Sequence, residues 1–131
     1  MKRLRVVLLV SFLIVIVVSF ALASNKNKTK AIDLGCGITT CIRSCDSTTG
    51  GYICSTYAVG KHYTADGNPL PLRVTAHAGC TLCTFYGCLQ SCSRTVIKDG
   101  YGTVSVSASC GISTAFEGNC FTWNSYCSCS D

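Results

Sequence analysis

Cysteine is the residue type that most constrains how this chain folds, because 12 of its 131 residues are cysteine. The number is even, so six disulfides would leave no thiol free. Such a density in a short chain is typical of scaffolds held together by cross-links. The pairing does not follow from the sequence alone. We expect disulfide bonds at all of the cysteines: Cys36, Cys41, Cys45, Cys54, Cys80, Cys83, Cys88, Cys92, Cys110, Cys120, Cys127 and Cys129.

Large apolar side chains are scarce once the N-terminal segment is set aside. From Ser24 onward, Ile, Leu, Val and Phe together number 19 residues, whereas Ser and Thr number 27. A chain of this composition gains little free energy from burial, and disulfides compensate by restricting the unfolded chain. Residues 31–131 are therefore predicted to form a single small disulfide-rich domain.

The first 23 residues have the pattern of a secretory signal peptide. Basic residues near the start precede an apolar run over residues 6–23, and Ala21-Leu22-Ala23 has the small-x-small form of a cleavage site. The run also approaches the length of a membrane span, so an uncleaved anchor over residues 6–23 is the alternative. Both interpretations place the cysteines in an oxidising compartment, and cleavage predicts a secreted, extracellular protein.

Residues 24–30 form a short polar segment, which is predicted to be a flexible basic tail. It contains Lys26, Lys28 and Lys30, and Asn27 begins a glycosylation acceptor pattern. From Ala31 onward the chain has five basic and six acidic residues, so a nucleic-acid binder is not expected. Attraction to anionic lipids requires clustered positive charge, so membrane contact is expected only through the lysine tail.

A metal site is the rival use of the cysteines. Cys80 and Cys83 have zinc-knuckle spacing, and His62 and His77 would complete a ligand set. Thiolate zinc sites belong to reducing compartments, however, whereas a secreted chain oxidises such cysteine pairs. We therefore expect neither a metal nor another cofactor.

The cysteine spacing repeats along the chain. Cys36-x4-Cys41-x3-Cys45 reappears as Cys83-x4-Cys88-x3-Cys92, which suggests a duplicated half-domain with parts at residues 31–79 and 80–131. Each C-x3-C pair would present both sulfurs on one face of a helix. One or two short helical turns are therefore predicted at these pairs.

Alternating apolar and polar residues predict mainly β hairpins elsewhere. Residues 103–110 alternate and are expected to pair with residues 94–98 through a turn at residues 99–102. Residues 70–78 alternate as well and are expected to pair with residues 57–64. A third hairpin is expected to join Phe121 and its neighbours to residues 126–129, where Cys127 and Cys129 share a face.

The spacing Cys41-x3-Cys45, followed by Gly51-Tyr52-Ile53-Cys54, resembles the first half of a cysteine-stabilised αβ module, as in invertebrate defensins. Cys120, followed by Cys127-Ser128-Cys129, resembles its second half. The resemblance covers about 25 residues, and the two halves lie much further apart than in the family. It implies that Cys127 and Cys129 bond to a C-x3-C pair, either Cys41 and Cys45 or Cys88 and Cys92.

No catalytic motif is evident, so the chain is predicted not to be an enzyme. It contains two histidines and a single glutamate, and it lacks nucleophile-elbow, zinc-protease and phosphate-loop patterns. Ten tyrosine, phenylalanine and tryptophan residues follow Ser24 in the sequence, and exposed aromatic side chains suit binding surfaces. Tyr101, in a predicted turn, and Trp123, between cysteines, are the first candidates.

These features favour a secreted non-enzymatic effector that binds an extracellular target, of the toxin or host-defence kind. An extracellular signalling ligand or adhesion module is one alternative. A protease inhibitor is another, with an exposed loop over residues 66–73 and Arg73 as the residue that a trypsin-like enzyme would recognise.

Overall fold

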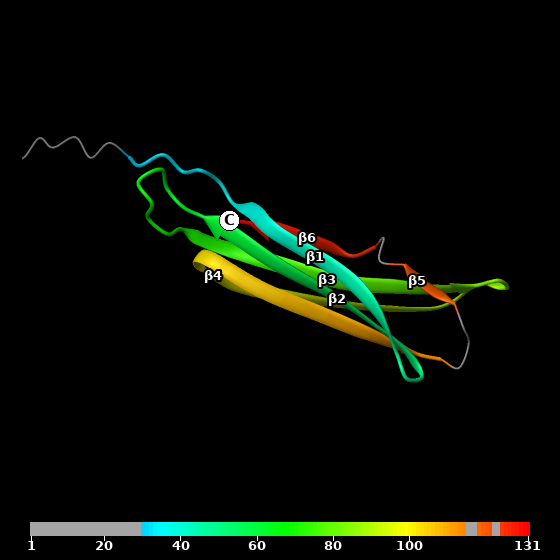
Figure 1. Cartoon of the computed structure of the whole chain (residues 1–131). Helices are drawn as coiled ribbons and strands as arrows, with labels where there is room; N and C mark the ends of the chain where they lie inside the picture. The colour runs from blue at the N-terminus through cyan, green and yellow to red at the C-terminus, as the bar shows by residue number, and fades with distance from the viewer. Residues whose placement is uncertain (1–29, 115–117, 122–123) are drawn as a thin grey trace, which may run out of the picture. The chain divides into compact units, whose positions relative to one another are not determined.

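The computed structural model describes residues 30–114, 118–121 and 124–131, and Ala31–Asp131 forms one compact unit (Figure 1). The described part is built of β-strands: β1 (Gly37–Thr48), β2 (Gly51–His62), β3 (Pro71–Thr84), β4 (Gly87–Ser113), β5 (Asn119–Phe121) and β6 (Tyr126–Ser130). Within these ranges there is no helix, and hence none long and apolar enough to cross a membrane. The predicted signal peptide, or anchor, at residues 1–23 lies outside the described residues.

The prediction of one or two short helical turns is wrong for the described residues. Cys41 and Cys45 lie in strand β1, and Cys88 and Cys92 lie in β4. Residues four apart lie on one face of a strand as well, so the C-x3-C spacing does not distinguish the two structures. The β-branched residues Thr39, Thr40 and Ile42 favour the strand.

Strand β4 is continuous over 27 residues and takes part in both layers of the fold. Residues 87–101 pair with β3, and residues 102–113 pair with β2. The predicted hairpin between residues 94–98 and 103–110 is therefore wrong. Gly102 has a φ of 69°, in the left-handed region, and the chain changes pairing partner at this residue.

The two halves of β4 belong to two facing layers (Figure 1). One layer contains β1, β2 and residues 102–113, and the other contains residues 87–101, β3, β5 and β6. The predicted pairing of residues 57–64 with residues 70–78 forms only next to the turn, where Tyr63 bridges Pro69 and the Leu70 amide donates to the His62 carbonyl. Beyond this point the prediction is wrong, because β2 and β3 pack face to face across the core. The Thr56 hydroxyl donates a hydrogen bond across this core to the carbonyl of His77, at 3.0 Å.

The predicted third hairpin is also corrected. Strands β5 and β6 both pair with β3, β5 at residues 81–83 and β6 at residues 73–77, so they follow one another along the same edge. The proposed boundary between residues 79 and 80 falls inside β3, so residues 31–79 and 80–131 do not form separate halves. The two repeated cysteine triplets also form different sets of bonds.

All twelve cysteines are disulfide-bonded, as predicted. The six bonds are Cys36–Cys129, Cys41–Cys127, Cys45–Cys54, Cys80–Cys120, Cys83–Cys88 and Cys92–Cys110. Of the bonds that the defensin-like resemblance implies, Cys127 bonds to Cys41, but Cys129 bonds to Cys36 rather than to Cys45. The bonds from Cys127 and Cys129 join β6 to β1 and its N-terminal flank. Cys92–Cys110 joins the two halves of β4.

The core between the layers consists of small and β-branched side chains, which allow the sheets to approach closely. Its buried members are Ala58, Leu72, Val74, Ala76, Ala78, Val104, Val106 and Ala108. A Cβ at Gly60 would lie 2.5 Å from a Val74 methyl group, so β2 requires glycine there. The alternating apolar residues between 72 and 78 and between 104 and 108 thus form the inward faces of their strands, as the alternation in the sequence indicates.

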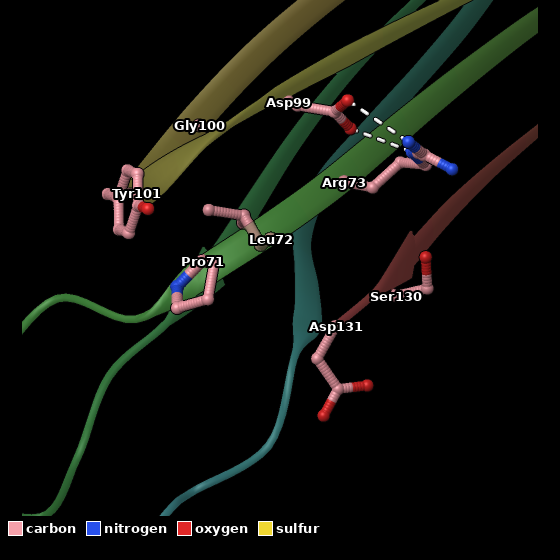
Figure 2. Close-up of a pocket in the computed structure, with 8 residues that line it drawn as sticks. All are labelled: Pro71, Leu72, Arg73, Asp99, Gly100, Tyr101, Ser130 and Asp131. Carbon is pink, nitrogen blue, oxygen red and sulfur yellow. Dashed lines mark hydrogen bonds and ion pairs between the residues drawn. The ribbon is translucent and has the colours of Figure 1, made fainter.

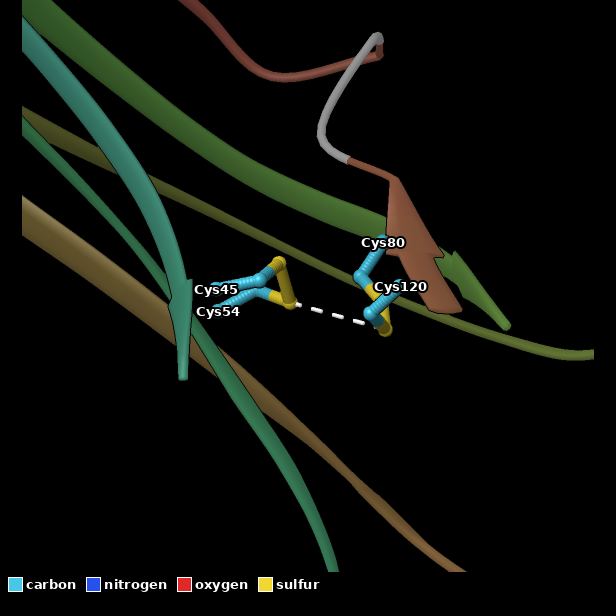
Figure 3. A group of neighbouring side chains, drawn as sticks. All are labelled: Cys45, Cys54, Cys80 and Cys120. Atoms are coloured by element: carbon cyan, nitrogen blue, oxygen red, sulfur yellow. Dashed lines mark hydrogen bonds between the residues drawn. A yellow bond between two sulfur atoms is a disulfide. The ribbon is translucent and has the colours of Figure 1, made fainter. Parts of the chain in front are cut away.

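Sulfur atoms make up much of a second core, near the β3–β4 turn. It contains buried Cys54, Cys80, Leu82 and Ile112. The Cys45–Cys54 and Cys80–Cys120 disulfides lie against one another here, with the Cys54 and Cys120 sulfurs 3.8 Å apart (Figure 3). Polarisable sulfur fills this end of the sandwich, where the chain supplies few large apolar residues.

Candidate functional site

The candidate site is a shallow hollow where β3 begins and β4 changes partner. It is lined by Pro71, Leu72, Arg73, Asp99, Gly100, Tyr101, Ser130 and Asp131 (Figure 2). Tyr101 is the cross-strand partner of Pro71 and stands between Gly100 and Gly102. Its side chain is 72% exposed, so the ring is available to a ligand. The binding role of Tyr101 remains a prediction.

An ion pair crosses the hollow beside Tyr101. Arg73 and Asp99 are direct cross-strand partners, and the guanidinium donates Nε to Oδ1 at 2.7 Å and Nη2 to Oδ2 at 3.1 Å (Figure 2). This hydrogen-bonded arginine lowers the pKa of Asp99 and is itself kept protonated. Ser130 flanks Arg73 on its other side, in β6. Three strands thus position one row of polar groups across the sheet.

The chemistry of this hollow suits recognition. It combines a planar, bidentate cation–anion pair with an exposed phenol, so it offers hydrogen-bond donors and acceptors next to an aromatic face. Both members of the pair are more than half exposed, so the pair contributes little to stability. Their geometry is nevertheless set by the strand register, so these polar groups are held in fixed positions.

Other predicted site residues lie outside the described ranges or away from this hollow. Trp123, Asn27, Lys26 and Lys28 fall outside the described residues, and Lys30 is exposed. The tail, glycosylation and Trp123 predictions therefore stay predictions.

The two histidines are held apart in separate hydrogen-bond networks. His62 is buried, with Nδ1 2.7 Å from the Pro71 carbonyl and Nε2 2.7 Å from the Asp33 carboxylate. His77 lies on β3, where Nδ1 is 2.7 Å from the Thr95 hydroxyl and the ring stacks on Tyr126. The rival zinc set is not assembled, because Cys80 and Cys83 bond to Cys120 and Cys88.

Two groups among the described residues have spacing that would suit a metal ion. Four sulfur atoms, of Cys45, Cys54, Cys80 and Cys120, lie within 4.8 Å of one another, but they belong to two disulfides and are not thiolates (Figure 3). The other group is His62 with Asp33 and Asp131. There the His62 nitrogen that faces Asp33 is already engaged in a hydrogen bond.

The sequence interpretation missed three arrangements. The Arg73–Asp99 pair depends on the register of β3 against β4, which the expected hairpins did not contain. The partner of His62 is Asp33, 29 residues away, and no local pattern connects them.

The third arrangement is the exposed aromatic pair at the β3–β4 turn, where Phe85 and Tyr86 are 98% and 89% exposed. The Cys83-x4-Cys88 spacing around two aromatic residues and a glycine would have indicated this turn.

Comparison with known proteins adds no relative. No protein-family model, no curated protein and no solved structure matches the chain.

Proposed function

We propose that this protein is a secreted, non-enzymatic effector of the toxin or host-defence kind, which binds an extracellular target through the hollow at Tyr101. The observation that carries the proposal is the exposed Tyr101 ring beside the bidentate Arg73–Asp99 pair. Six disulfides fit a small secreted protein and keep these groups in place without a target.

The position of Arg73 argues against the alternative that the protein is a protease inhibitor. This residue lies within β3 and is paired with Asp99 on one side and Ser130 on the other. A protease needs to reach both backbone edges of an extended segment around the residue that it recognises, and both edges are occupied here. The segment before it, with a turn at Ala65 and Asp66, lies outside the strand.

A cell-binding titration tests the proposal. The fluorescently labelled secreted protein is titrated onto bacterial, fungal and cultured animal cells, and viability is followed in parallel. We expect saturable binding to at least one cell type, accompanied by loss of viability. Tyr101→Ala and Arg73→Ala should each weaken this binding about tenfold or more, since buried aromatic and arginine contacts dominate interfaces.

Tyr57→Ala is the matched control, because Tyr57 is an exposed tyrosine on β2, in the opposite layer. It should leave binding unchanged. Absence of binding, or equal losses in the Tyr57 and Tyr101 variants, would contradict the proposed site. Saturable binding without toxicity would instead support the signalling or adhesion alternative.

A further inference from the structure

The β3–β4 turn presents two aromatic side chains at the end of a rigid hairpin. Phe85 and Tyr86 are almost fully exposed, and their rings meet edge to face with centroids 5.7 Å apart. The last strand pair is Thr84 with Gly87, and the Cys83–Cys88 disulfide joins the strands one residue further back. In the view of Figure 1 the hairpin reaches past the β1–β2 turn and β5.

Local bonds hold this turn in its projecting form. The Tyr86 amide donates to the Thr84 hydroxyl at 3.2 Å, and the same hydroxyl donates to the Gly87 carbonyl at 3.3 Å. Gly87 has a φ of 116°, which suits glycine. Because the disulfide and these bonds order the turn before contact, binding through the two rings costs little conformational entropy.

The chain segment that forms the end of this hairpin contains no charged residue. Residues 79–93 form a run of 15 residues without a single Asp, Glu, Lys, Arg or His. The polar side chains in this run are neutral: Thr81, Thr84, Gln90, Ser91 and Ser93. Such a hairpin enters the boundary between lipid headgroups and acyl chains without desolvating an ion of its own, and the backbone groups that face each other across its two strands are paired.

We propose that Phe85 and Tyr86 are a membrane-contact site, which inserts into the interface of a zwitterionic lipid bilayer. Tyrosine and phenylalanine favour this region, where an apolar ring and a polar tip are both satisfied. The size of the feature favours lipid over a protein partner. Two aromatic side chains cover at most about 500 Å², whereas a standard protein interface buries about 800 Å² per partner.

This site lies at the opposite end of β3 from the hollow at Tyr101, since β3 begins at Pro71 and ends at Thr84. It is also separate from the lysine tail, the part expected from the sequence to contact membranes. The membrane proposal and the proposed target-binding function can therefore fail independently.

Flotation with phosphatidylcholine vesicles tests the membrane site. The full secreted chain should bind, and binding should be insensitive to salt because no charge is involved. The doubly substituted chain, Phe85→Ser with Tyr86→Ser, should bind the vesicles about tenfold or more weakly. Burial of even one aromatic ring changes a binding affinity by about this factor. Tyr57→Ser, an exposed tyrosine on β2 and the control, should bind like the parent chain. These side chains are exposed, so their replacement leaves the fold intact.

A fluorescent reporter places the turn directly. In a chain that carries Trp123→Phe, Phe85→Trp makes the turn the only source of tryptophan emission. Vesicles should shift this emission to shorter wavelength, and lipid-attached quenchers should reduce it. The proposal is overturned if the parent chain does not bind phosphatidylcholine, if the doubly substituted chain binds equally well, or if binding requires anionic lipid and disappears at high salt.

Discussion

His62 is the residue whose charge state the fold determines most directly. Its side chain is 3% exposed, and both ring nitrogens face acceptors, the Pro71 carbonyl and the Asp33 carboxylate. Both nitrogens can donate only when the imidazole is protonated. The hydrogen bond to Pro71, and then that to Asp33, raise the pKa of His62 above its ordinary value of 6.5.

This arrangement predicts a stability that falls with rising pH. A group whose pKa is higher in the folded state stabilises the fold fully below its unfolded pKa of 6.5, and this contribution disappears as pH rises through the folded pKa. Denaturant unfolding between about pH 5 and pH 9 should show this decrease. Asp33→Asn should flatten the profile, whereas His77→Gln, on a different network, should preserve it. An unchanged slope in Asp33→Asn would contradict the assignment.

At the scale of the element, the bend in β4 decides how the two layers connect. Gly102 adopts a φ of 69°, and a Cβ on this residue would lie 2.7 Å from the Tyr63 hydroxyl oxygen and 2.9 Å from the Pro69 Cβ. Backbone conformation and space therefore both require glycine at this position. Gly111, further along the same strand, has a negative φ and room for a Cβ.

Gly102→Ala should lower the free energy of unfolding by about 1–3 kcal/mol, because it adds both backbone strain and a close contact. Gly111→Ala should change it by less than about 0.5 kcal/mol, as is usual for an exposed position. Denaturant titration at constant pH measures both values. Equal stabilities of the two variants would show that the bend does not depend on Gly102.

At the scale of the whole molecule, two disulfides connect the two layers along the edge where β1 and β6 lie. Cys36–Cys129 and Cys41–Cys127 span 93 and 86 residues of sequence, yet their ends are close neighbours along β1 and β6. While one bond is present, the other closes a loop of only a few residues. The two bonds therefore restrict nearly the same freedom of the unfolded chain.

We predict strongly non-additive losses when these bonds are removed. Replacing either pair by serine should cost about 2 kcal/mol, and removing the second bond from that variant should cost about 4 kcal/mol, because a long loop then opens. Unfolding under non-reducing conditions measures the three variants against the parent chain. Equal costs for the first and second removals would argue against this pairing.

Several features follow from the sequence because they depend on local composition and periodicity. The cysteine content indicated a cross-linked scaffold, and alternation identified the buried faces of residues 103–110 and 70–78 correctly. These inferences hold because side chains alternate between the two faces of any strand, whatever its partner.

Partner choice was decided only by the tertiary structure. A strand has the same alternation when it pairs with its neighbour in a hairpin and when it packs face to face against that neighbour. Strands β2 and β3, and the two halves of β4, adopt the second arrangement in this protein. The Cys36–Cys129, Cys41–Cys127 and Cys92–Cys110 disulfides depend on it, because each joins one layer to the other. The hollow at Tyr101 depends on the pairing of β3 with β4 and β6 inside one layer. Both depend on which strands become neighbours, and alternation within a strand carries no information about that.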